Sequence, residues 1–115
     1  MAISKTIMVT NARISRAARA AGQVGIEVSY WRVTATQINY PKTGDATIDV
    51  YLGAFTDATA STSGAEPVTG RRFTFTAAAL GISDLHAVTT TQLYAAILAA
   101  VNADASDALN GAVST

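Results

Sequence analysis

The sequence predicts one α+β domain: a three-stranded antiparallel β-meander packed by one C-terminal helix, with an extended or partly helical N-terminal arm. Its 115 residues suit a single domain. Three stretches rich in β-branched and aromatic residues are separated by turn signals. The longest stretch with helical spacing of apolar residues comes after them. We therefore expect a basic arm over 1–25, an α+β core over 26–103 and a flexible acidic tail over 104–115.

The expected arm is basic and poor in large apolar side chains. Residues 3–9 are compatible with a short strand. Asn11 is a suitable N-cap for a short helix over 12–21 that ends at Gly22. Such an alanine-rich helix has little to bury, so we expect contact with another surface to order it. No acid occurs before residue 26, whereas the cations there are Lys5, Arg13, Arg16 and Arg19.

The core strands are predicted at 26–40, 46–55 and 68–77, and their short connections favour a meander of sequential neighbours. In the second and third strands apolar and polar residues alternate, which indicates one buried face. The first strand changes parity, so we expect a bulge or bend near Tyr30 and Trp31. The residues predicted to face the core from the second and third strands are Ile48, Val50, Leu52, Phe73 and Phe75.

The C-terminal helix is predicted over roughly 91–103. Thr89 and Gln92 have the spacing of a capping box, and Thr91 is an alternative N-cap. The apolar stripe of this helix, which should lie on the sheet, contains Leu93, Ile97 and Val101.

Composition argues for assembly. Lys and Arg balance Asp and Glu, so the formal net charge is zero, and only 14% of residues are charged, against about 25% in an average protein. Such a surface repels copies of itself weakly. The charges are also separated along the chain, because the N-terminal part is basic and the part after Arg72 carries only acids. This separation predicts either solvated ends or head-to-tail complementarity between copies.

Catalysis and cofactor binding are not expected. The chain has no Cys and one His, which excludes disulfides and a site of several histidines within one chain. Ser83, Asp84 and His86 have the residue types of a catalytic triad, but crowding in sequence is not triad geometry. We expect no metal, cofactor or small-molecule substrate.

Nucleic acid and membrane are not expected partners either. The arm lacks an aromatic residue for base stacking, and the chain as a whole is neutral. The longest apolar run, residues 93–101, is much shorter than the roughly 20 residues of a membrane span.

Aromatic residues outside the predicted core favour a protein interface, because such residues are enriched at interface centres. The alternative is that a bend places most of them beneath the loop over 56–67. The residues predicted to contact neighbouring subunits, from the arm and from this aromatic group, are Arg13, Arg16, Arg19, Tyr30, Tyr40, Tyr51 and Phe55.

The order of features over residues 30–76 resembles small virion proteins of the tail, baseplate and fibre region of tailed bacteriophages. The resemblance implies a non-enzymatic structural subunit of the virion that contacts copies of itself and other virion proteins. The alanine-rich ends depart from the pattern, and no functional residue carries over. The alternative is a small monomeric binding module, adhesin-like or host-modulating, that uses the loop over 56–67. The segments that carry the resemblance are Tyr30-Trp31-Arg32-Val33, Ile38-Asn39-Tyr40, Asp49 to Phe55, Asp57, Gly64 to Val68 and Arg72 to Phe75.

Overall fold

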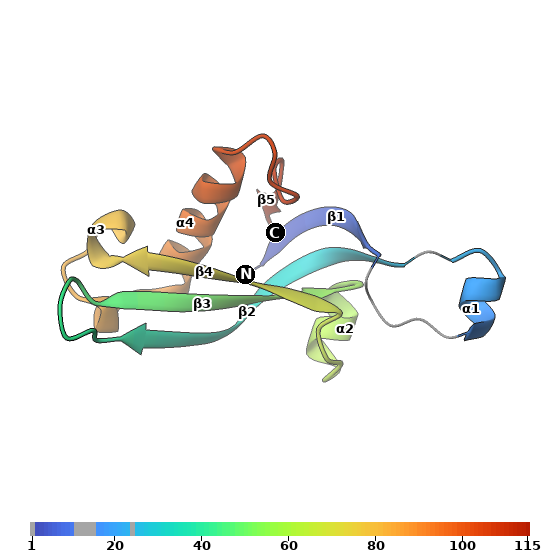
Figure 1. Cartoon of the computed structure of the whole chain (residues 1–115), viewed down its shortest axis with the longest axis horizontal. Helices are drawn as coiled ribbons and strands as arrows, with labels where there is room; N and C mark the ends of the chain where they lie inside the picture. The colour runs from blue at the N-terminus through green and yellow to red at the C-terminus, as the bar shows by residue number, and fades with distance from the viewer. Residues whose placement is uncertain (1, 11–15, 24) are drawn as a thin grey trace.

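A five-stranded antiparallel sheet runs along the molecule in the order β4-β3-β2-β1-β5 (Figure 1). The computed structural model describes residues 2–10, 16–23 and 25–115. The molecule is elongated, with extents of 52 × 26 × 26 Å. The elements are β1 (Ile3–Val9), α1 (Arg16–Ala20), β2 (Ile26–Asn39), β3 (Thr47–Phe55), α2 (Ala58–Thr62), β4 (Thr69–Thr76), α3 (Ala77–Leu80), the 3-10 turn η1 (Leu85–Ala87), α4 (Thr90–Asn102) and β5 (Val113–Ser114).

The α+β class and the antiparallel meander are confirmed, but the sheet has five strands rather than three. The three predicted strands are β2, β3 and β4, with ends within a residue of those expected. β1 joins the sheet beside β2, although the arm separates the two strands in sequence. The short β5 pairs with the start of β1, where Ala2 and Thr115 exchange two backbone hydrogen bonds. Both additions depend on pairing between distant residues, which periodicity does not reveal.

β2 changes its buried parity, as predicted. Val28 and Trp31 are three residues apart, yet both lie in the core. The register with β3 then shifts between Val33 and Ala35, slightly beyond the expected position. The register with β1 also shifts, and there the Trp31 indole N–H donates to the carbonyl of Lys5 at 3.0 Å. These irregularities let one long strand pair with β1 at one end and β3 at the other.

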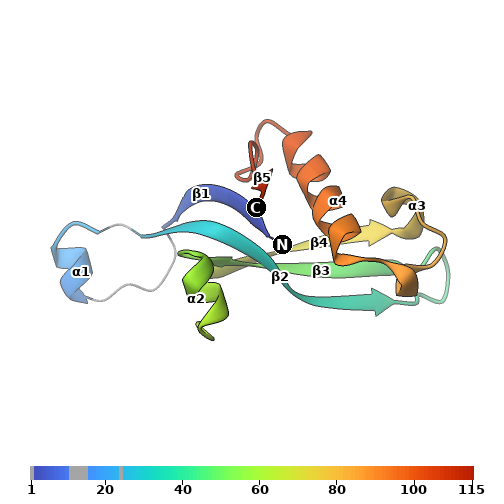
Figure 2. The same cartoon turned by 180° about the vertical axis from the view of Figure 1, so that it is seen from behind.

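Helix α4 covers one face of the sheet, which we call the inner face, and α2 lies on the other, the outer face (Figure 2). The predicted capping box of Thr89 and Gln92 is present, so Thr89 is the N-cap. The predicted stripe is buried, together with Tyr94. Leu109 and Ala112 are also buried in this core, so the boundary expected after residue 103 does not separate the tail from the packed domain. The side chains that α4 buries are Leu93, Tyr94, Ile97 and Val101.

Candidate interaction surfaces

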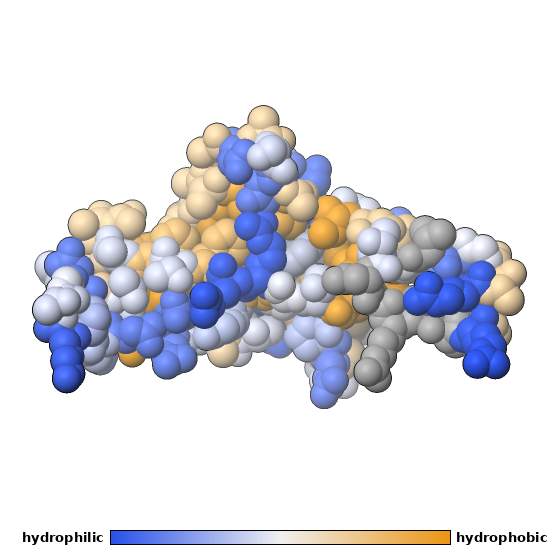
Figure 3. Space-filling view, viewed as in Figure 1, coloured by the Kyte–Doolittle hydropathy of each residue, from blue (hydrophilic) through white to orange (hydrophobic). Residues whose placement is uncertain are grey.

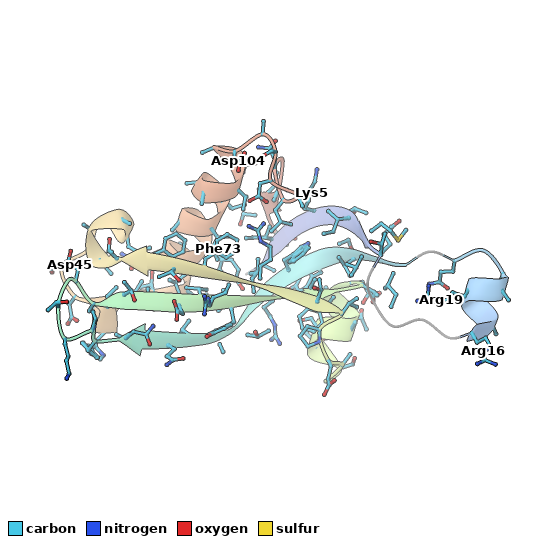
Figure 4. All side chains as sticks on the ribbon, in the orientation of Figure 1. Lys5, Arg16, Arg19, Asp45, Phe73 and Asp104 are labelled. Carbon is cyan, nitrogen blue, oxygen red and sulfur yellow. The ribbon has the colours of Figure 1, made fainter. Side chains whose placement is uncertain are left out.

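Two of the three described cations of the arm lie at one end of the molecule. Arg16 and Arg19 lie on α1, beyond the last residues of β1, and Lys5 lies far from them near the middle (Figure 4). Arg16, Ala17, Arg19 and Ala20 are all exposed. A five-residue helix is too short to be stable through its own hydrogen bonds. The predicted contact residue Arg13 lies outside the described residues.

The predicted interface aromatics differ widely in exposure. Tyr40 is 66% exposed, whereas Tyr30 and Tyr51 are partly buried. Phe55 is 2% exposed, so the prediction that it points outward is wrong. It lies at the end of β3 where the following segment folds back as α2, and the Arg32 guanidinium lies 5.6 Å from its ring centre. For Phe55 the alternative expectation, burial beneath the segment over 56–67, fits the structure.

The segment over 56–67, the binding loop of the alternative interpretation, is largely ordered against the sheet. Asp57 caps α2 by accepting from the Ala60 N–H at 2.8 Å. Ser61 is buried within the helix. A Cβ at Gly53 on β3 would lie 3.0 Å from Pro67, so the end of the segment packs directly on the outer face.

A groove of about 360 Å³ lies at the end of the molecule opposite the arm. We call it the end groove. Its wall combines the turn between β2 and β3 with α3 and η1, which lie far apart in sequence. The Tyr40 hydroxyl and His86 Nε2 form a hydrogen bond, and their rings stack with centroids 5.9 Å apart. The described lining residues are Tyr40, Asp45, Ala46, Thr76, Ala77, Ala78, Ser83, Asp84, Leu85 and His86.

The side chains with triad residue types are not arranged as a triad. The Asp84 carboxylate accepts from the backbone N–H of His86 at 3.0 Å and caps η1. His86 Nε2 is bonded to Tyr40. Over the described ranges, no hydrogen bond joins the Ser83 hydroxyl to His86. Asp84 and His86 form part of the groove wall.

The end groove is acidic. Asp45 and Asp84 line it, and its described lining contains no Lys or Arg. Figure 4 places Asp45 and the two α1 arginines at opposite ends of the long axis. In Figure 3 hydrophilic surface lies at both ends, whereas hydrophobic surface gathers where α4 meets the sheet. The exposed arginines of α1 therefore lie at one end, and the exposed carboxylates of Asp45 and Asp84 lie at the other, where Lys42 occupies the same turn as Asp45.

A second polar cluster lies on the outer face of the sheet. The Asp49 carboxylate accepts from Thr74 at 2.6 Å and from Asn39 at 2.9 Å. These two hydrogen bonds lower the pKa of Asp49. The carboxylate is held within the sheet surface and is paired by neighbours on both adjacent strands.

The adjacent arginines of β4 face opposite sides of the sheet. Arg71 lies on the inner face and forms a bidentate pair with Asp107, at 2.6 and 3.1 Å. This hydrogen bonding lowers the pKa of Asp107. Arg72 is exposed opposite Tyr51. The Arg71 contact joins the edge strand to the tail, a role the sequence did not indicate.

In the part of the chain that the structure describes, no group of three or more His, Cys, Asp or Glu side chains could hold a metal ion. No helix of the same residues is both long and apolar enough to cross a membrane. Comparison with known protein families, with curated proteins and with solved structures found no match for this chain.

Proposed function

We propose that this chain is a non-enzymatic structural subunit of a bacteriophage virion, in the tail, baseplate or fibre-attachment region, where it assembles in multiple copies. The resemblance over residues 30–76 supports the virion assignment. The observation that supports assembly is the placement of the basic α1 and the acidic end groove at opposite ends of a 52 Å molecule.

Opposite charges at opposite ends favour a contact between different surfaces of two copies. Such a contact repeats, so it generates rings or open chains instead of closed pairs. Electrostatic complementarity of this kind sets orientation and register more than affinity. The proposed arrangement places α1 of one subunit in the end groove of the next.

The chemistry of the two surfaces is compatible. Arg16 and Arg19 are three residues apart, so they share one side of α1. Carboxylates bind guanidinium groups by paired hydrogen bonds, and an aromatic face adds a cation–π contact. In the end groove Asp45 and Asp84 supply the carboxylates, and Tyr40 supplies an exposed ring.

Light scattering of the purified protein over a range of concentrations and salt tests this proposal. We expect oligomers at low ionic strength that dissociate as salt rises, because exposed charge pairs are screened. Replacing both Arg16 and Arg19 by Ala should weaken assembly at least tenfold. Replacing Lys5 and Arg72 by Ala removes the same charge outside both α1 and the end groove, so this pair is the matched control.

A monomer under all these conditions, with an intact fold by circular dichroism, would contradict assembly and favour the small binding module. Equal weakening by the control pair would show that net charge matters and α1 does not. The virion assignment has its own test, namely that the protein is found in purified particles in a fixed copy number.

A further inference from the structure

The two edge regions of the sheet differ in the regularity of their strand pairing. At one edge β5 pairs with the start of β1, and the register of β1 is itself irregular. At the other edge β4 pairs with β3 over eight successive residues without a register shift, from Thr69 to Thr76. β4 therefore presents a long, regular outer side.

The outer backbone of β4 has no partner strand among the described residues, although Thr69, Gly70 and Arg71 line a hollow together with the end of β1. No turn, loop or cap backbone hydrogen bond in those ranges ends on Thr69–Thr76. The side-chain bonds at Arg71, Thr74 and Thr76 use side-chain atoms of β4. Natural edge strands are protected by Pro, charged residues, a bulge or shortness. β4 is eight residues long and has no Pro, no Lys and no register shift, and its charges are Arg72 and Arg71, of which Arg71 is held by Asp107.

We propose that β4 pairs antiparallel with β4 of a second copy about a two-fold axis, forming one continuous sheet of ten strands, five from each copy. This contact is separate from the head-to-tail contact proposed above and does not depend on a virion role. It uses the side of the molecule and reaches the end groove only at Thr76, while α1 lies at the far end.

Alternation along β4 restricts the register. Arg71, Phe73 and Phe75 face α4, whereas Arg72 and Thr74 face outward. Residues directly opposite in an antiparallel pair share one face of the sheet. A continuous sheet with both α4 helices on the same side must therefore place inner residues opposite inner residues.

Among the registers that meet this condition, one pairs the most residues without placing two like charges opposite each other. Centred on Phe73, it pairs residues 70–76, with Arg71 opposite Phe75 and Arg72 opposite Thr74 of the other copy. A register centred on Arg72 would place two arginines directly opposite each other, which is destabilising. One centred on Thr74 would keep only residues 72–76 within the strand.

The side chains favour a second copy as the occupant. Arg71 already lies over the Phe73 ring at 4.7 Å, and the proposed register gives it a second aromatic partner, Phe75 of the other copy. Phe73 and Phe75 are only partly buried and stack on each other with centroids 6.3 Å apart. The pairing would extend this aromatic row across the two-fold axis and cover its exposed edge.

Disulfide trapping tests both the contact and its register. Arg72 and Thr74 are exposed, so Arg72→Cys and Thr74→Cys leave the core intact, and the natural chain contains no Cys. Directly opposite Cβ atoms lie about 5 Å apart, whereas the diagonal pairs that join like positions lie about 7–8 Å apart. Oxidising an equimolar mixture of the two variants should give several times more cross-linked dimer than either variant alone.

The experiment is best done with both variants also carrying Arg16→Ala and Arg19→Ala, so that head-to-tail assembly does not contribute. Dimer yield in the mixture no higher than in the single variants would overturn the proposal. As a second measurement on the unmodified chain, hydrogen exchange of the β4 amides should slow as protein concentration rises. Exchange that is independent of concentration up to the millimolar range would equally overturn it.

Discussion

The hydroxyl of Tyr94 accepts a hydrogen bond from the backbone N–H of Val33 at 2.7 Å, and this contact joins α4 to the irregular part of β2. Val33 immediately precedes the register shift between β2 and β3. Tyr94 is 3% exposed, and burial raises its pKa. The inner face thus combines apolar packing with one specific polar contact at the point where strand pairing is irregular.

Replacing Tyr94 by Phe should lower the free energy of unfolding by about 1 kcal/mol, because the partly buried Val33 N–H loses its acceptor. Urea denaturation followed by circular dichroism measures this loss. The matched control is Tyr51→Phe, since Tyr51 is a partly exposed residue on the outer face. Equal effects of the two changes would show that the hydrogen bond has no specific role.

The Arg71–Asp107 pair should make stability depend on acid pH. The pKa of Asp107 is lowered in the folded chain, so its contribution is complete above the unfolded value of about 4 and is lost as pH falls through the folded value. Wild-type protein should therefore lose stability between pH 5 and pH 2, and Asp107→Asn should lose less over this interval.

A double-mutant cycle separates this pair from the other carboxylates. With Arg71→Gln and Asp107→Asn, the coupling free energy at pH 7 should be about 1 kcal/mol, as for a partly exposed bidentate pair. At pH 2 it should approach zero because the carboxyl group is protonated. A coupling that persists in acid would mean that packing, rather than charge, links β4 to the tail.

Gly53 is expected to be intolerant of a side chain. An added Cβ would lie 2.8 Å from Thr34 Cγ2 and 3.0 Å from Pro67 Cγ. Gly53→Ala should therefore destabilise the fold by about 1–3 kcal/mol through overpacking. Gly70→Ala, on the residue directly opposite in β4, is the control, because there the nearest atom is 3.3 Å away. In thermal unfolding, Gly53→Ala should have a lower midpoint temperature than Gly70→Ala.

The capping box should contribute measurably to α4. Thr89→Ala removes the side-chain acceptor of the Gln92 N–H, and we expect a loss of about 1 kcal/mol in unfolding free energy. Thr91 is exposed and lies two residues further along the helix. Thr91→Ala should be neutral or slightly stabilising, because Ala favours helix. The reverse order in urea denaturation would assign the N-cap to Thr91.

The candidate surfaces were only partly predictable. The arm was visible because its cations lie within one short stretch of sequence and no acid interrupts them. The end groove was not, because Tyr40 and His86 are 46 residues apart and meet only when β2 and η1 reach the same end of the molecule. Phe55 was misplaced because alternation assigns it to the outer face but does not show that α2 covers that face.

Local chemistry in the sequence determined the elements themselves: the three strands of the meander, the parity change in β2, and α4 with its cap and stripe. These features depend on neighbours within a few residues, where periodicity and capping operate. Tertiary structure alone decided that Ile3–Val9 and Val113–Ser114 complete the sheet, that Leu109 enters the core, and that acidic and basic side chains occupy opposite ends. Those outcomes depend on contacts between residues far apart in sequence. They are stabilised by side-chain burial and strand pairing that form only when distant segments meet.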